Sequence, residues 1–196
     1  MPFLKSLPPD AVLKDVLRTS PAIGVPFAQW HEELLRGPSP FSVGERELFA
    51  AYVSALNACG YCHGEHEAVA VSFGIAPGVL DGLLADIDSA PVEVRLRPVF
   101  AYLRKLTLTP SKMIAADAEA MSAAGWSEEA LYHAASVCAM FCCDNRIIQG
   151  LGLQRHSPQA LAEVVGRLHD FGYRSTIALI EGRSFELLPK DPAATR

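Results

Sequence analysis

The sequence predicts an all-α protein folded as a single domain. Stretches rich in Ala and Leu alternate with isolated Pro and Gly residues along all 196 residues, and 50% of the residues are apolar. No convincing series of apolar residues shows the period of two that is typical of strands, although 176–180 is ambiguous. No low-complexity linker divides the chain, and its length is sufficient for a sizeable core. We therefore expect one domain over residues 1–196.

Capping and helix-breaking residues indicate where the central helices begin and end. Ser42 and Glu45 form a capping box, S-x-x-E, which opens a helix immediately after Ser42. Asn57 and Gly60 loosen the chain, and Gly74 is a natural stop for the helix that follows. From similar Pro, Ser and Gly signals, the other helices are expected over residues 10–19, 27–36, 77–85, 93–107, 112–124, 127–149 and 158–170.

Two further expectations concern the segments outside the central helices. Ser111 is the expected N-cap of the helix over 112–124, because a Ser side chain can accept a hydrogen bond from the first helical turn. The tail over 183–196 carries no helix signal. We expect it to be irregular or exchanged with a neighbouring copy of the chain.

Charge and hydropathy exclude several classes of protein. Seventeen basic and 22 acidic residues give a net charge of −5, so a basic nucleic-acid-binding face is not expected. The longest charge-free segment, 48–64, is shorter than the roughly 20 apolar residues that cross a membrane, and no signal peptide is evident. We expect a cytoplasmic protein with no membrane or nucleic-acid partner. Its surplus apolar surface is expected inside a helical core and between the subunits of a homo-oligomer (a dimer, trimer or hexamer).

The chain has five cysteines, an odd number. Together with the lack of an export signal, this predicts reduced thiols, so a disulfide here would be a working redox bond rather than a structural one. Cys138 and Cys142 share one face of a helix, either as small core residues or as a second redox pair. Cys143 points away from its neighbour Cys142, so a disulfide between these two would be strained.

Cys59, Cys62 and His66 form the most informative spacing in the sequence. In a helix that opens near Cys59 they stand at i, i+3 and i+7, and therefore on one face. Cys62 then lies in the first turn, where the helix dipole favours a thiolate. His66 lies one turn further along, within reach of the Cys62 sulfur.

Glu47 joins this group if the helices before and after the bend form an antiparallel hairpin. A bend between Leu56 and Asn57 means that facing positions have residue numbers adding to 113, and Glu47 and His66 satisfy that condition. A carboxylate would then orient and charge the imidazole, the imidazole would lower the pKa of the Cys62 thiol, and a second thiol would resolve the oxidised product.

The pattern Glu-x11-Cys-x2-Cys-x3-His, from Glu47 to His66, resembles the alkylhydroperoxidase D (AhpD)-like proteins of the carboxymuconolactone decarboxylase superfamily. Further along, Asp144-Asn145-Arg146-Ile147 is similar to the Asn-Arg segment of that family. The resemblance covers residues 40–155, with further helices on both sides. The length and the C-terminal extension are similar to the subgroup called peroxidase-related proteins.

The resemblance implies an AhpD-like helical bundle with a central antiparallel hairpin, and a thiol-dependent peroxidase or disulfide oxidoreductase activity without a bound cofactor or metal. Carried over by position, Cys62 attacks the hydroperoxide, Cys59 resolves the product, His66 acts as the base and Glu47 as the proton-relay carboxylate. An external dithiol protein would restore the thiols. One position departs from the pattern, because some members have a His where this chain has Tyr61.

Other interpretations of the same residues stay open. Cys59, Cys62 and His66 could instead be zinc ligands, with Cys142 or His133 as a fourth, or the two thiols could be inert core residues. A decarboxylase-like enzyme would not need two cysteines. A non-catalytic redox sensor would form the disulfide without turnover.

Overall fold

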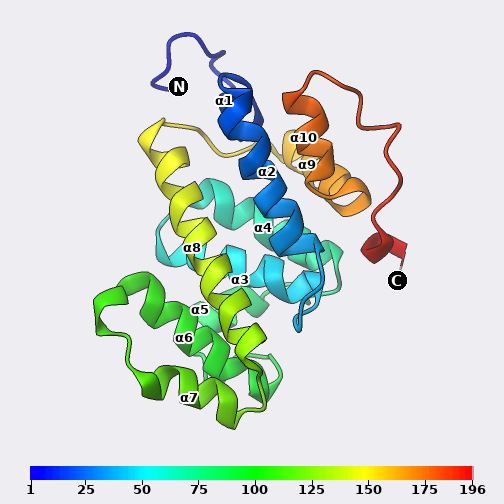
Figure 1. Cartoon of the computed structure of the whole chain (residues 1–196). Helices are drawn as coiled ribbons and strands as arrows, with labels where there is room; N and C mark the ends of the chain where they lie inside the picture. The colour runs from blue at the N-terminus through cyan, green and yellow to red at the C-terminus, as the bar shows by residue number, and fades with distance from the viewer. Residues whose placement is uncertain (196) are drawn as a thin grey trace. The chain divides into compact units, whose positions relative to one another are not determined.

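Within residues 1–195, the part of the chain that the structure describes, every regular element is helical (Figure 1). The structure is a computed structural model. Its α-helices are α1 (Leu13–Arg18), α2 (Pro21–Arg36), α3 (Val43–Leu56), α4 (Gly60–Ser72), α5 (Val79–Ala85), α6 (Arg97–Leu108), α7 (Ala115–Ala123), α8 (Glu128–Gly150), α9 (Pro158–Phe171) and α10 (Arg174–Ile180). Short 3-10 helices are η1 (Val94–Leu96), η2 (Pro110–Lys112) and η3 (Pro192–Thr195). The all-α prediction is confirmed. No helix in the described range is long and apolar enough to cross a membrane.

The chain divides into two compact units. The first, which we call the thiol unit, is Ser39–Asn145 and holds α3 to α7 and most of α8. The second, the terminal unit, combines Met1–Pro38 with the described residues from Arg146 onward and holds α1, α2, α9 and α10. The thiol unit contains all the residues of the predicted site, Glu47, Cys59, Cys62 and His66.

Helix α3 is the most deeply buried element of the thiol unit. Every residue from Arg46 to Ser54 is buried, and α4, α5 and α6 all pack against it. A helix covered on all sides needs no polar face. This burial explains the long charge-free segment that includes most of α3.

The predicted capping box opens α3. The Ser42 hydroxyl accepts a hydrogen bond from the Glu45 N–H at 3.2 Å, and the Glu45 carboxylate accepts one from the Ser42 N–H at 2.7 Å. Two N–H groups that lack partners inside the helix are thereby satisfied. The prediction that α3 begins directly after Ser42 is confirmed.

Ser42→Ala is expected to lower the free energy of unfolding by about 1 kcal/mol, because the first turn of α3 loses its side-chain acceptor. Urea denaturation measures the change. Ser111→Ala is the matched control, because Ser111 is exposed and caps no helix. Equal losses in both variants would contradict a capping role for Ser42.

An aromatic cluster forms part of the core around α3. The Phe49 ring meets the rings of Phe41 and Phe100 edge to face, with centroids 4.9 Å and 5.3 Å apart. Tyr52 meets Phe100 in the same way at 5.1 Å, and Trp126 lies 4.5 Å from Phe41. Edge-to-face contacts of this kind add stability beyond the area that the rings bury. They hold α3 against α6 and the loop before α8.

Four expected helix starts are wrong by three or more residues. Helix α1 begins at Leu13 instead of residue 10, and α6 begins at Arg97, after η1, instead of residue 93. The helix expected from residue 27 begins at Pro21. Pro is tolerated in the first turn, because the N–H groups of that turn have no partner inside the helix and the missing N–H of Pro therefore costs no hydrogen bond. Pro26 lies inside α2. The helix expected after Ser111 begins at Ala115, because Ser111 lies inside η2 and Asp117 accepts a hydrogen bond from the Ile114 N–H at 2.8 Å.

The ambiguous segment 176–180 belongs to a helix, α10. Ile180 lies in a small apolar core with Leu17 of α1 and Ala28 of α2. The β-branched residues of this segment leave its local preference undecided. Packing within the terminal unit selects the helix.

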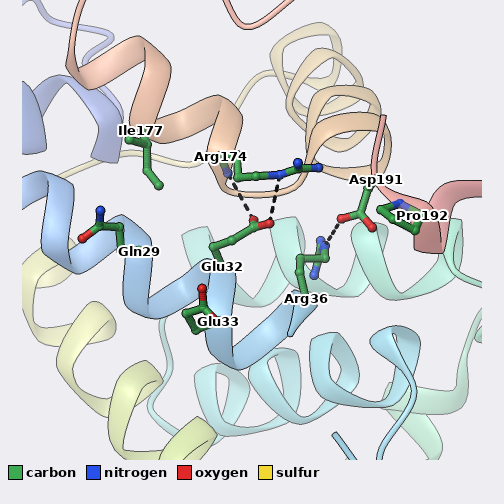
Figure 2. A pocket seen from close by; sticks show the side chains of 8 residues that line it. All are labelled: Gln29, Glu32, Glu33, Arg36, Arg174, Ile177, Asp191 and Pro192. Atoms are coloured by element: carbon green, nitrogen blue, oxygen red, sulfur yellow. Dashed lines mark hydrogen bonds and ion pairs between the residues drawn. The ribbon is translucent and has the colours of Figure 1, made fainter. Parts of the chain in front are cut away.

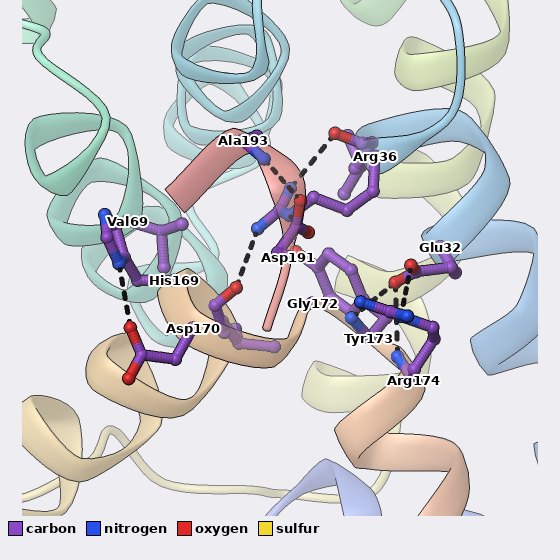
Figure 3. A network of polar contacts seen from close by, with 12 residues as sticks. Glu32, Arg36, Val69, His169, Asp170, Gly172, Tyr173, Arg174, Asp191 and Ala193 are labelled. Atoms are coloured by element: carbon purple, nitrogen blue, oxygen red, sulfur yellow. Dashed lines mark hydrogen bonds and ion pairs between the residues drawn. The ribbon is translucent and has the colours of Figure 1, made fainter. Parts of the chain in front are cut away.

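The C-terminal tail is irregular before η3, which agrees with the expectation of an irregular tail. Figures 2 and 3 show how polar contacts attach the tail to the rest of the terminal unit. The buried Asp191 carboxylate lies 3.5 Å from the Arg36 guanidinium, and the Asp191 N–H donates to the Asp170 carbonyl at 2.6 Å. Nearby, the Glu32 carboxylate accepts from the N–H groups of Tyr173 and Arg174 at 2.7 Å and 3.1 Å. Glu32, Arg36, Arg174 and Asp191 are among the residues that line a pocket of about 350 Å³, and none of its lining residues is a cysteine.

Candidate active site

The connection between α3 and α4 positions the first cysteine. The Ala58 N–H donates to the Ala55 carbonyl and the Cys59 N–H donates to the Ser54 carbonyl, both at 2.9 Å. This pair of bonds is a Schellman motif, which requires a left-handed residue after the helix. Ala58 provides it with a φ of 55°, a conformation that costs a residue other than Gly about 1–2 kcal/mol. The strained turn makes Cys59 the N-cap of α4.

Cys59 and Cys62 form a buried pair of thiols. Their sulfur atoms lie 3.4 Å apart, and each residue is 2% exposed. Both cysteines are reduced, and the distance fits an S–H···S hydrogen bond rather than a disulfide of about 2.05 Å. The predicted spacing therefore brings the two sulfurs together at the start of α4.

The surroundings of Cys59 favour its thiolate. The pKa of the Cys59 thiol falls from 9.0 to about 6, chiefly because of the side-chain hydrogen bond that its sulfur shares with Cys62. Burial opposes this shift in pKa, while the N–H groups of Cys62 and Tyr61 and the side chain of Asn145 add further hydrogen bonds. A thiolate at an N-cap gains from the same unpaired N–H groups that bind anions at helix N-termini.

Cys62 has the opposite environment. Its pKa is raised by the side-chain hydrogen bond with Cys59, by burial, and by the negative charges of Cys59, Asp144 and Glu65, which oppose a second negative charge. We expected the first-turn dipole to favour a thiolate at Cys62. Of the two thiols, Cys59 therefore has the lower pKa, and the role of Cys62 as the attacking thiolate stays a prediction.

His66 and Glu47 make the contact that the hairpin predicted. The His66 Nδ1 lies 2.6 Å from the Glu47 carboxylate, and the two residues are 4% and 0% exposed. Burial lowers the pKa of His66, but the charge and hydrogen bond of Glu47 outweigh it, so the pKa of His66 is raised overall. The edge of the His66 ring also contacts Phe141, with centroids 4.5 Å apart. The structure therefore places an oriented imidazole with a raised pKa one helical turn beyond Cys62.

The spacing of the sequence did not identify the amide groups beside Cys59. Asn57 and Asn145 hydrogen-bond to one another, and Asn145 also bonds to Ser54. The sequence contains one signal for these groups: Ser54 is a polar residue within the apolar second half of a predicted helix, and Asn57 is a polar residue directly after it. Asn145 belongs to the segment that resembles the Asn-Arg segment of the family, although no role was assigned to it.

The other candidate residues lie elsewhere in the thiol unit. Cys138 is buried, and its sulfur lies 3.3 Å from the Thr107 hydroxyl, whereas Cys143 is exposed. The Cys142 sulfur lies 3.4 Å from the Asn57 amide nitrogen. Burial lowers the pKa of His133. Among residues 1–195 no three His, Cys, Asp or Glu side chains are grouped as a metal site would require.

Two crystal structures are similar to this chain. One is the AhpD core of an uncharacterized peroxidase-related protein from Ralstonia eutropha JMP134, with 25% sequence identity and a TM-score of 0.67 over 72% of this chain and 75% of that chain. The other is an uncharacterized peroxidase-related protein from Silicibacter sp. TM1040, with 23% identity and a TM-score of 0.68 over 78% of this chain and 79% of that chain. No known family profile matches the sequence, and no curated protein sequence does.

Proposed function

We propose that this protein, which has the AhpD-like fold of the peroxidase-related proteins, is a thiol-dependent peroxidase and disulfide oxidoreductase. The observation that carries the proposal is the buried Cys59–Cys62 pair, with sulfurs 3.4 Å apart, beside the buried His66–Glu47 pair. A low-pKa thiolate next to a second thiol is the arrangement that two-cysteine redox chemistry requires. The substrates are a hydroperoxide and an external dithiol.

In the first step, the Cys62 sulfur attacks the terminal oxygen of the hydroperoxide. The Cys62 proton passes to the Cys59 thiolate along their hydrogen bond, a new S–O bond forms, and the O–O bond breaks. The leaving alkoxide takes a proton from the His66 imidazolium. The products are an alcohol, or water from hydrogen peroxide, and a sulfenic acid on Cys62.

In the second step, Cys59 resolves the sulfenic acid. Neutral His66 recovers a proton as Cys59 ionises, and the Cys59 thiolate attacks the Cys62 sulfur. The S–S bond forms as the S–O bond breaks, and the leaving hydroxide takes the proton from His66 and departs as water. An external dithiol then reduces the disulfide by two thiol–disulfide exchanges and becomes oxidised itself.

The raised pKa of His66 supports a role as the proton donor in the first step and the acceptor in the second. The resemblance alone implied only a base. Glu47 keeps the imidazole charged before the peroxide arrives, because it is a buried partner at 2.6 Å.

The test begins with the reduced full-length chain and one equivalent of hydrogen peroxide. We expect one equivalent to convert two thiols into a Cys59–Cys62 disulfide, mapped by mass spectrometry. With excess dithiothreitol, the chain should then consume hydrogen peroxide or cumene hydroperoxide continuously. Cys143→Ser is the matched control, because that exposed sulfur takes no part in the proposed steps.

Two results would contradict the proposal. A disulfide that forms without continuous peroxide consumption would identify a redox sensor instead. Peroxide that leaves both thiols reduced would exclude thiol chemistry at this pair.

A further inference from the structure

The position of Cys59 depends on the turn that joins α3 to α4. Asn57 is the C-cap of α3, and Ala58 follows it with a φ of 55°. The Cys59 N–H then donates to the Ser54 carbonyl at 2.9 Å, which closes the turn. A left-handed residue other than Gly persists only where the surrounding structure enforces its conformation. Contacts that fix the last turn of α3 therefore also stabilise the backbone at Ala58.

The side-chain amide of Asn145 makes two such contacts. Its nitrogen donates to the Ser54 hydroxyl at 3.0 Å, and its oxygen accepts from the Asn57 amide nitrogen at 2.9 Å. Asn145 and Ser54 are both 0% exposed, so water does not compete for the bond between them. Buried polar groups that are satisfied in this way hold one arrangement, because a buried polar atom without a partner is costly. One side chain of α8 thereby ties together two residues at the end of α3.

The Asn57 amide is held at a second point of the same helix. Its nitrogen lies 3.4 Å from the Cys142 sulfur, as well as 2.9 Å from the Asn145 oxygen. Cys142 and Asn145 are three residues apart and therefore share one face of α8. This face of α8 fixes the residue directly before the left-handed Ala58.

We propose that Asn145 is a positioning residue of the thiol site. Its amide clamps the last turn of α3, and the clamp holds the left-handed turn at Ala58 that places Cys59 beside Cys62. The proposal rests on the thiol chemistry proposed above, since it explains how the two sulfurs come to lie 3.4 Å apart before they react. It adds a residue from α8, 86 positions along the chain from Cys59, to a site that the sequence placed entirely on α3 and α4.

Positioning of this kind favours the disulfide over the dithiol. Two thiols that the fold holds close together react as if at a high local concentration, because little freedom remains to be lost when the bond forms. Without the clamp, the reduced chain gains conformations in which Ala58 leaves the left-handed region and the Cys59 sulfur moves away from Cys62. The disulfide excludes those conformations. Loss of the Asn145 amide should therefore shift the equilibrium toward the dithiol.

Exchange with glutathione measures this equilibrium without any peroxide. The Cys59 and Cys62 thiols give up two protons and two electrons as their S–S bond forms, and one oxidised glutathione takes them up and becomes two reduced glutathione molecules. Fragment mass spectrometry gives the fraction of the full-length chain with the Cys59–Cys62 disulfide over a series of glutathione ratios. For Asn145→Ala we expect the equilibrium constant for disulfide formation to fall about tenfold.

A second substitution distinguishes positioning from a general structural effect. Gly adopts a left-handed φ without strain, so Ala58→Gly should make the turn less dependent on the clamp. When Ala58→Gly is combined with Asn145→Ala, we expect most of the loss to be recovered, and Ala58→Gly alone completes the double-mutant cycle. Ala58→Gly removes atoms and cannot fill the space that Asn145→Ala leaves, so damage to packing alone would not be rescued.

Two further variants complete the experiment. Asn57→Ala removes one of the two clamp contacts at a partly buried residue, and should lower the equilibrium constant about threefold. The matched control is Thr107→Val, which removes a hydroxyl 3.3 Å from a different buried sulfur, that of Cys138, and should leave the equilibrium constant unchanged. Circular dichroism checks that each variant is folded.

Four results would overturn the proposal. The equilibrium constants of Asn145→Ala and Asn57→Ala could equal that of the wild type. The double variant could keep the full loss of Asn145→Ala. Thr107→Val could lower the constant as much as Asn145→Ala does. A wild-type chain that stays reduced at every glutathione ratio would need no variant.

Peroxide consumption is measured separately, so the two proposals can fail independently. A clamp effect on the glutathione equilibrium, in a wild-type chain that consumes no peroxide, would retain Asn145 as a positioning residue and reject the proposed peroxidase. Peroxide turnover with equal equilibrium constants in all variants would retain the peroxidase and reject the clamp.

Discussion

A Cys62→Ser variant should lose steady-state peroxide consumption by more than about three orders of magnitude, because a serine hydroxyl cannot replace a thiol as the nucleophile. Cys62 is 2% exposed, and Ser is close to it in size. The variant should therefore remain folded while it loses activity. The decay of hydrogen peroxide with excess dithiothreitol measures the loss.

Cys59→Ser separates the two sulfurs. We expect this variant to reduce about one equivalent of peroxide and then stop, because the sulfenic acid on Cys62 has no neighbouring thiol to resolve it. A dimedone adduct at Cys62 would identify that intermediate. Cys138→Ser should keep turnover, because Cys138 takes no part in the steps. An adduct that forms instead on Cys59 of the Cys62→Ser variant, with retained single turnover, would reverse the order of the two cysteines.

Glu47→Gln should lower peroxide consumption by about 10²–10³-fold, because His66 loses the charge that keeps it protonated. Glu47 is completely buried and lies 2.6 Å from the imidazole. Gln keeps the shape but carries no charge, so the pKa of His66 should fall. Nitrogen-15 NMR of the imidazole measures that pKa directly.

The same pair predicts the pH dependence of activity and stability. The pKa of His66 is raised in the folded chain, so the acid form is lost, and peroxidase activity falls, as the pH rises through that pKa. The stabilisation from protonated His66 is fully present below the unfolded pKa of about 6.5 and disappears over the same rise in pH. In Glu47→Gln both losses should begin at lower pH.

Glu67→Gln is the matched control for Glu47→Gln. Glu67 lies 3.4 Å from His63 on α4, but both side chains are about one-third exposed, at 33% and 30%. A partly exposed pair of this kind contributes little. Equal losses of activity in Glu67→Gln and Glu47→Gln would show that loss of a carboxylate anywhere on the hairpin is sufficient, and would remove the special role of Glu47.

Local signals in the sequence determined the helices that carry most of the site. The capping box at Ser42 and the stop at Gly74 depend only on neighbouring residues, so the ends of the α3–α4 hairpin were predictable. The contact between Glu47 and His66 was predictable as well. A short turn between two helices leaves one antiparallel register, and the register decides which side chains meet.

Only the tertiary structure decided which of the two thiols has the lower pKa. Cys59 and Cys62 are three residues apart, and the dipole argument alone favoured Cys62. The pKa values depend on burial, on the turn that makes Cys59 an N-cap, and on Asn145 and Asp144 from a distant helix. Such contacts join residues that are far apart in the sequence, and their effect on a thiol depends on distances and orientations that spacing along one helix does not contain.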